Sequence, residues 1–252
     1  MMRQPISNRD KARVQAAFTQ VELLVVLAVI GVVGMMGLAA SAKLINQTKI
    51  AQCSVNLRQM DLAQLMYAAD NSDNLPRNQG NWVWDVSGTV TTPLLQYGVV
   101  PKTMYCPGTA PRFTDELNWA NPQQSLWYFG APTFHVIGYA MTLGSSALPS
   151  TNRNLTVNPQ PVTVGALVIP LQPPSQRVLT ADANLSLDGV NFTTIYGGFT
   201  YNGGAYPHIC PHLDGAYPAG GNVGMLDGHV EWRAFKNMKI ETAPGTPPSF
   251  YW

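Results

Sequence analysis

Charged residues are scarce in this chain of 252 residues, since Lys, Arg, Asp and Glu together make up only 12% of it. The formal net charge is +1, and no basic stripe occurs, which excludes an electrostatic nucleic-acid binder. Glycine and proline are frequent, with 22 and 20 residues. Little charge combined with many turn-forming residues favours an extracytoplasmic, loop-rich β domain over a cytosolic enzyme.

Motifs of the common enzyme classes are also lacking. The chain has no phosphate-binding P-loop, no dinucleotide-binding fingerprint and no metalloprotease helix. Residues 144–146, Gly-Ser-Ser, lack the flanking pattern of a nucleophile elbow, and only four histidines could serve as general bases. We therefore expect no catalytic residue, no enzymatic activity and no cofactor, apart from the metal ion considered below.

The chain does contain one long apolar run, residues 18–40, with a single charge at Glu22. About 20 apolar residues suffice for a helix to cross a bilayer, so this run is expected to span a membrane. Residues 1–17 form a basic leader that would stay in the cytoplasm. A plain signal anchor would explain both features but not Glu22. A cleaved secretory peptide would end at the Ala-Ser-Ala site of residues 40–42, after an unusually long apolar core.

Residues 17–26, AFTQVELLVV, resemble the processing signal of type IV pilins and type II secretion pseudopilins. The resemblance implies that prepilin peptidase cleaves after Ala17 and that Phe18 becomes a methylated amino terminus. It also implies that Glu22 pairs with that amino terminus in a neighbouring subunit. An ion pair of this kind is strong at low dielectric, so it can set the register of assembly.

No proline occurs between residues 18 and 71, and the polar half of this stretch keeps a helical rhythm through Ile50, Cys53, Leu57 and Met60. We expect one helix over residues 18–75, with residues 18–40 as its transmembrane and filament-core part. Short strands are expected near residues 136–142, 162–169 and 177–182. The predicted fold is α+β and pilin-like: the long helix, whose first half spans the membrane, packs on an antiparallel β-sheet domain with long loops, residues 76–252.

Residues 220–232, GGNVGMLDGHVEW, resemble the C-terminal signature of a bacterial pseudopilin subgroup, usually written H-x9-DG. Asp227 and Gly228 lie between two alternating apolar runs, a strong signal for a two-residue hairpin turn. Such a turn would pair Leu226 with His229, and the resulting register would place four apolar side chains on one face, where they pack a core. We therefore interpret Asp227 as a turn former rather than a catalyst. The four side chains are those of Val223, Met225, Val230 and Trp232.

An exported domain with three cysteines is expected to hold one disulfide and one odd thiol. The subgroup carries cysteines at the positions that Cys53 and Cys106 resemble, so the resemblance implies that these two pair. His208, Cys210 and His212 alternate, and an extended chain would point all three to one side. Imidazole and thiolate are ligands of zinc or copper, and related pseudopilins add calcium as a candidate. The competing interpretation is a polar loop without a metal.

The predicted function is that of a structural subunit of a type II secretion or type IV pilus-like filament. Its partners would be the inner membrane, prepilin peptidase and further subunits of a homo-oligomeric filament, with no nucleic acid. It would be a single-pass protein of the bacterial inner membrane, with its C-terminal domain in the periplasm or on an extracellular filament. The alternative is an exported, membrane-anchored ligand-binding or adhesive domain that stacks aromatic side chains on sugars or surfaces. Those aromatic residues are Trp82, Trp84, Trp119 and Trp127.

Overall fold

The computed structural model of the chain describes residues 19–80, 82–109, 127, 134–144, 154–158, 162–164, 167–169, 171–194, 208–242 and 248–252, and only the backbone at 36–42, 162–164 and 167–169. The predicted leader, the cleavage residue Ala17 and the new terminus Phe18 lie outside the described residues, as does Trp119. The chain divides into two compact units, Met1–Leu44 and Ile45–Trp252.

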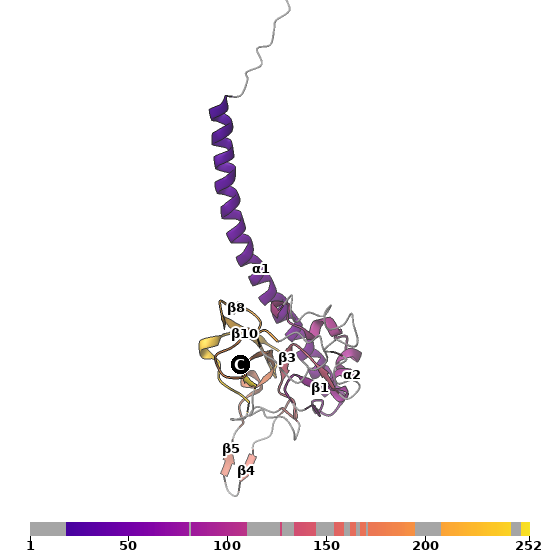
Figure 1. Cartoon of the computed structure of the whole chain (residues 1–252). Coiled ribbons are helices and arrows are strands. Elements are labelled where there is room, and N and C mark those ends of the chain that lie inside the picture. The colour runs from indigo at the N-terminus through magenta and orange to yellow at the C-terminus, as the bar shows by residue number, and fades with distance from the viewer. Residues whose placement is uncertain are drawn as a thin grey trace, which may run out of the picture. The chain divides into compact units, whose positions relative to one another are not determined.

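The first element, α1, is one helix of 51 residues, Gln20–Asp70 (Figure 1). It begins two residues after the expected start, since it was predicted from residue 18, and it ends before the predicted limit near residue 75. Two non-glycine residues in the turn after it, Ser72 and Asp73, adopt positive φ values of 54° and 63°. The amide of Asp73 donates to the carbonyl of Ala68, which turns the chain out of the helix.

The predicted membrane span is not supported, and the prediction of a single-pass inner-membrane protein is wrong. Among the residues that the structure describes, no helix combines the length and the apolar character needed to cross a bilayer. The predicted pilin-like fold with a membrane-spanning first half is therefore wrong. The predicted transmembrane and periplasmic placement is wrong with it.

The β structure also differs from the single sheet domain that was expected, because the described strands form five small antiparallel sheets. One has four strands in the order β11-β10-β6-β3, and the others are the pairs β1-β2, β12-β7, β4-β5 and β8-β9. Strands of two to six residues cannot build one wide sheet, so loops and short helices join the pairs. The strands are β1 (Asp85–Ser87), β2 (Phe134–Val136), β3 (Tyr139–Met141), β4 (Val162–Val164), β5 (Leu167–Ile169), β6 (Val178–Asp182), β7 (Asn184–Ser186), β8 (Leu213–Asp214), β9 (Tyr217–Pro218), β10 (Gly220–Met225), β11 (Val230–Ala234) and β12 (Ser249–Tyr251). The further helices are α2 (Gly88–Gln96), η1 (Pro101–Met104), η2 (Pro107–Thr109), η3 (Pro174–Gln176) and η5 (Phe235–Asn237).

The four-stranded sheet packs one face on the part of α1 that belongs to the unit Ile45–Trp252. Thr180 of β6 donates a hydrogen bond of 2.6 Å to the buried carboxyl of Asp61. Asn56 donates to the hydroxyl oxygen of Tyr139, a residue of β3, at 3.3 Å. The predicted core face of α1 is confirmed at Cys53, Leu57 and Met60, which are fully buried, whereas Ile50 is only partly buried. These contacts place helix residues over the middle strand β6 and the edge strand β3.

The C-terminal hairpin, β10 and β11, exists, but its predicted register is wrong by one residue. Asn222 lies opposite Trp232, and Gly224 lies opposite Val230, whereas Val223 and Met225 were expected there. The cause is Gly228, whose φ of 86° lengthens the turn so that the amide of Met225 donates to the carbonyl of His229. A slip of one residue exchanges the two faces of a strand, and Trp232 is consequently 40% exposed instead of packing a core.

Candidate metal centre

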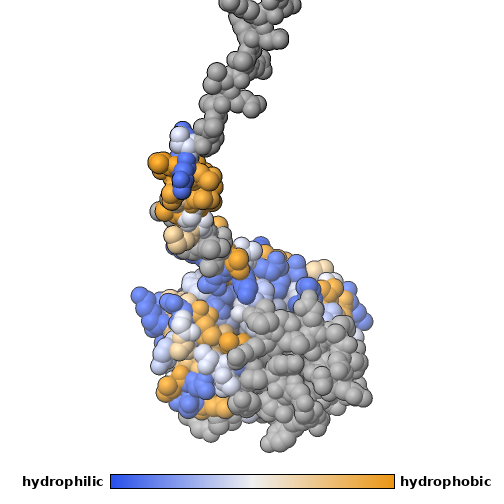
Figure 2. Space-filling view, turned by 45° about the horizontal axis from the view of Figure 1, so that its top comes forward, coloured by the Kyte–Doolittle hydropathy of each residue, from blue (hydrophilic) through white to orange (hydrophobic). Residues whose placement is uncertain are grey.

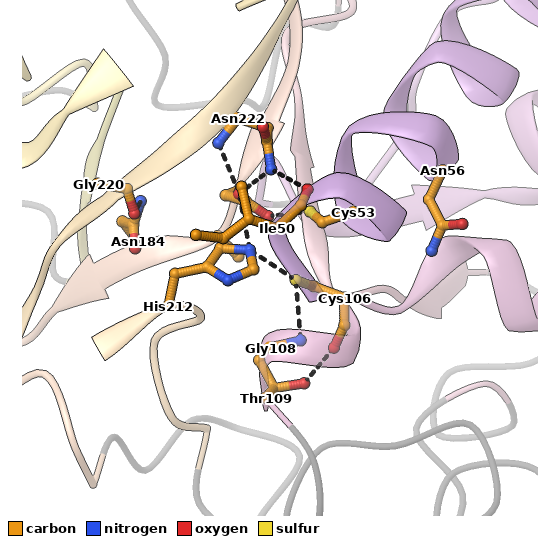
Figure 3. Close-up of polar contacts among 12 residues, drawn as sticks. Ile50, Cys53, Asn56, Cys106, Gly108, Thr109, Asn184, His212, Gly220 and Asn222 are labelled. Atoms are coloured by element: carbon orange, nitrogen blue, oxygen red, sulfur yellow. Dashed lines mark hydrogen bonds and ion pairs between the residues drawn. The ribbon is translucent and has the colours of Figure 1, made fainter. Parts of the chain in front are cut away.

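Four side chains with metal-binding atoms meet beside α1, and each comes from a different part of the chain. Figure 3 labels three of them, Cys53, Cys106 and His212. Cys53 lies on α1, Cys106 lies between η1 and η2, Asp182 ends β6, and His212 directly precedes β8. One ligand atom from each residue lies within 4.8 Å of all the others, and all four residues are buried. We call these four residues the CCDH cluster.

Three interatomic distances define the shape of the CCDH cluster. The thiol of Cys53 donates to Asp182 Oδ1 at 2.8 Å. Cys106 Sγ lies 3.4 Å from His212 Nε2, and the same ring nitrogen lies 3.5 Å from Asp182 Oδ2. A tetrahedral zinc ion, with bonds of about 2.3 Å to sulfur and about 2.0–2.1 Å to nitrogen or oxygen, separates its ligand atoms by roughly 3.3–3.8 Å. The separations of 3.4 Å and 3.5 Å lie in that range, and the separation of 2.8 Å between Cys53 and Asp182 is shorter.

The two thiols of the cluster have different electrostatic surroundings. Burial is the largest cause that raises the pKa of Cys53 well above its usual value, and its contacts with Cys106 and Asp182 act in the same direction. Burial also acts to raise the pKa of Cys106, but hydrogen bonds with Cys53 and His212 outweigh it, so the pKa of Cys106 is lowered. Cys106 is thus the thiol that more readily becomes a thiolate, the form that binds metals.

His212 is held in the cluster by an uncommon backbone conformation. Its φ is 55°, a left-handed value that a non-glycine residue seldom adopts. Gly108 lies against the ring, because a Cβ atom at that glycine would be 2.8 Å from His212 Cε1. Its Nδ1 is buried and has no hydrogen-bond partner among the described residues, so the ring is oriented through Nε2 toward Cys106 and Asp182. Backbone strain of this kind is often found at functional sites.

Backbone and amide donors surround the acidic ligands from outside. The amide N–H of Asn222 donates to Asp182 Oδ2 at 2.7 Å, and its side-chain Nδ2 lies 3.4 Å from the same oxygen. That Nδ2 also donates to the carbonyl of Ile50 on α1 at 3.1 Å. The N–H of Gly108 donates to Cys106 Sγ at 3.3 Å. Such outer contacts orient ligands and disperse the negative charge of a carboxylate and a thiolate.

The predicted metal triad of His208, Cys210 and His212 is not brought together. His208 Nε2 bonds to the carbonyl of Ala183 at 2.9 Å, and burial lowers the pKa of this histidine to about 4. The sulfur of Cys210 bonds to the backbone of Leu185, and burial raises the pKa of this thiol to about 12. Only His212 reaches the CCDH cluster, so the alternation of the three residues along the chain did not identify the ligands.

The predicted Cys53–Cys106 disulfide is not present as such, since all three cysteines are free and buried. The structure nevertheless brings the sulfurs of Cys53 and Cys106 into the same cluster. Asp182 is the ligand that the sequence interpretation missed. The signal for it was a single carboxylate at the end of a short apolar strand, where burial makes an acidic residue unusual.

The remaining predicted site residues lie elsewhere. Asp227 accepts hydrogen bonds from the backbone and the ring of His229, and with Gly228 it forms the hairpin turn. Two of the aromatic residues proposed for ligand stacking, Trp84 and Trp127, are only 3% and 4% exposed. They pack in the core, so these two rings are not available to a sugar or a surface.

All four residues of the CCDH cluster belong to this chain. Comparison with known proteins finds no family model, no curated protein and no solved structure that matches the chain.

Proposed function

We propose that the chain is a structural subunit that assembles with copies of itself into a filament through α1, in the manner of type II secretion pseudopilins and type IV pilus-like filaments. The observation that carries this proposal is the exposure of the apolar part of α1. Eleven large hydrophobic side chains between Val21 and Met35 are each 46% to 69% exposed. They are Val21, Leu23, Leu24, Val25, Val26, Leu27, Val29, Ile30, Val32, Val33 and Met35.

This apolar surface surrounds the helix instead of forming one stripe, because residues 23–27 are apolar at five consecutive positions. Figure 2 shows the hydrophobic side chains gathered on this part of α1. A helix that is hydrophobic on all sides is stable when other groups surround it. The positions of Gly31 and Gly34 support helix-to-helix contact, since a Cβ atom at either would meet nothing within 4 Å.

Glu22 has a local role that the sequence interpretation did not consider. Its carboxylate accepts hydrogen bonds of 2.8 Å from both the N–H and the hydroxyl of Thr19, while the Glu22 amide donates to the Thr19 hydroxyl at 3.2 Å. This reciprocal arrangement is a capping box, which stabilises the start of α1. The backbone and side-chain hydrogen bonds of Thr19 lower the pKa of Glu22, so the exposed carboxylate is charged at neutral pH.

A charged carboxylate beside a fully apolar helix surface needs a cation when copies of α1 pack together. We propose that the cation is the amino terminus of a neighbouring copy, created by prepilin peptidase between Ala17 and Phe18. The occupant of the apolar surface is then a second copy of this chain. The proposal requires exposed apolar helices and a charge pair, and it does not depend on a membrane span.

The test separates the charge of Glu22 from its capping role. Glu22→Gln keeps a capping-box acceptor but removes the charge, whereas Thr19→Ala removes the cap and keeps the charge. After coexpression with prepilin peptidase, filaments are collected by sedimentation and counted by electron microscopy. We expect Glu22→Gln to reduce the amount of filaments at least tenfold, because the amino terminus of the neighbouring copy loses its charged partner. Thr19→Ala should keep the parental amount.

A second exposed carboxylate provides the matched control. Asp214→Asn makes the same change of charge on the surface of the other compact unit, and it should assemble like the parent chain. Filaments of Glu22→Gln in parental amounts would overturn the proposed role of Glu22. Absence of filaments from the parent chain itself, with the leader removed, would overturn the filament function.

A further inference from the structure

We propose that the CCDH cluster is a structural zinc site, in which Cys53, Cys106, Asp182 and His212 bind one Zn²⁺ ion and join α1 to the loops and the sheet beside it. The four ligand atoms already lie within 4.8 Å of one another, and all four residues are buried. The inference is independent of the filament function, because it concerns only residues of the unit Ile45–Trp252.

The donor set selects the ion. Two sulfurs and an imidazole nitrogen are soft or borderline ligands, which favour zinc over calcium or magnesium, whose sites use oxygen atoms almost alone. A carboxylate oxygen completes a set of four, the usual coordination number of structural zinc. The burial of all four ligands indicates the role of the ion. A closed site with four protein ligands leaves no open position for water or substrate, so the ion stabilises the fold and does not catalyse.

The balance of charge and protons also fits a divalent cation. When the two thiols bind Zn²⁺, they release two protons, and the two thiolates together with the Asp182 carboxylate offset the charge of the ion. His212 binds as a neutral imidazole through Nε2, the nitrogen that faces Cys106 and Asp182. The N–H groups of Asn222 and Gly108 already point at the carboxylate and at Cys106 Sγ. They are outer contacts suited to stabilising the remaining negative charge.

A disulfide between Cys53 and Cys106 is the competing use of the same sulfurs. It would remove the thiol hydrogen that Cys53 donates to Asp182 Oδ1, and it would leave His212 beside a sulfur that no longer binds protons or metals. The buried carboxylate would then keep fewer donors, which is unfavourable in a fully enclosed site. Metal binding instead gives all four side chains a partner.

The zinc site would link segments that are distant in sequence. Cys53 and His212 are separated by most of the chain, and Cys106 lies in a loop held by two short 3₁₀ helices. One ion that binds all four positions restricts the unfolded chain in several loops at once, and its binding free energy adds directly to folding. The site therefore acts as the cross-link that a small, loop-rich unit of short strands needs.

The test uses the full chain, purified under reducing conditions without a metal-affinity tag, stripped with a chelator and supplied with Zn²⁺ or Co²⁺. Elemental mass spectrometry should find about one zinc ion per chain. The cobalt form should show a thiolate-to-metal charge-transfer band and the intense visible bands of a tetrahedral ion. This measurement on the parent chain does not depend on any variant folding correctly.

Two cysteine variants give a matched comparison. Cys106→Ser removes a proposed ligand, and Cys210→Ser makes the same change at a buried cysteine outside the cluster. We expect Cys106→Ser to lower bound zinc at least tenfold and Cys210→Ser to keep it. Asp182→Asn should keep the charge-transfer band from the two thiolates but bind Co²⁺ at least tenfold more weakly.

Three results would overturn the proposal. One is a reconstituted parent chain that holds neither zinc nor cobalt while its thiols are free. Another is equal loss of metal in Cys106→Ser and Cys210→Ser. The third is a Cys53–Cys106 disulfide found by unreduced peptide mapping of chain purified without reductant, together with no bound metal.

Discussion

Gly224 of β10 lies directly against the buried carboxyl of Asp61, at a point where a side chain has no room. A Cβ atom at position 224 would be 1.9 Å from Asp61 Oδ2 and 2.8 Å from Thr180 Oγ1. Neither group can move away without weakening the hydrogen bond of 2.6 Å that Thr180 donates to Asp61. This contact sets how closely α1 approaches the middle of the four-stranded sheet.

Gly224→Ala should therefore destabilise the chain. Forcing a methyl group into this packed contact is expected to lower the free energy of unfolding by about 1–3 kcal/mol. Urea unfolding of the full chain, followed by tryptophan fluorescence, measures the change. Gly34→Ala is the control, because a Cβ atom at Gly34 meets nothing within 4 Å, so it should not lower the stability. Equal stability of Gly224→Ala and the parent would contradict the described approach of helix and sheet.

Asp61 should make stability fall as the pH rises. Burial raises the pKa of this carboxyl to about 8, and the hydrogen bond from Thr180 opposes only part of that rise. Between about pH 4 and about pH 8 the folded chain keeps the proton while the unfolded chain has lost it. In that range the free energy of unfolding is expected to fall by up to about 1.4 kcal/mol per pH unit from this group. Below this pH range the stability contributed by protonated Asp61 is fully present, and above the range it is lost.

Asp61→Asn isolates this effect, since an amide has similar size, can accept the bond from Thr180 and does not titrate. The variant should unfold at a urea concentration that depends less on pH than the parent does. The free energy of unfolding of the variant should rise progressively relative to that of the parent from about pH 5 to about pH 8. Parallel pH profiles for the two chains would show that Asp61 does not stay protonated in the fold.

The helix shows what the sequence can predict. Its existence over most of residues 18–75 followed from the lack of proline, and its core face followed from the spacing of Cys53, Leu57 and Met60, all buried. The membrane span did not follow, because hydropathy over residues 18–40 says nothing of what surrounds a helix. The capping box of Thr19 and Glu22 was also readable in the sequence, as Thr-x-x-Glu before an apolar run.

The site was much less predictable. Cys53 and Cys106 were expected to meet because of a resemblance, but Asp182 and His212 reach them through strand pairing and a turn that no local pattern reveals. His212 was grouped with His208 and Cys210 on the assumption of an extended chain, which its left-handed φ of 55° breaks. The hairpin shows the same limit, since one positive φ at Gly228 moved the register by one residue and exchanged the two faces.

Gly228 should be sensitive to substitution for that reason. Its φ of 86° is unfavourable for residues with a side chain, and a Cβ atom would also lie 3.3 Å from Leu65 Cδ1. We expect Gly228→Ala to lower the free energy of unfolding by about 1–2 kcal/mol, and Gly228→Asn to lower it less, because asparagine tolerates left-handed conformations better. Thermal unfolding of the two variants compares them directly. A larger loss for asparagine than for alanine would argue against the left-handed turn.

The amino terminus of the mature chain gives the last prediction. The small residues before the apolar run indicate a peptidase that removes only residues 1–17, so N-terminal sequencing after coexpression with prepilin peptidase should begin at a methylated Phe18. Ala17→Leu should remain uncut, because a large side chain does not fit a cleavage site that requires small residues. A first residue of Lys43 would instead indicate a secreted domain, and Met1 or Met2 an unprocessed chain. Either result would remove the new amino terminus that Glu22 needs as its partner.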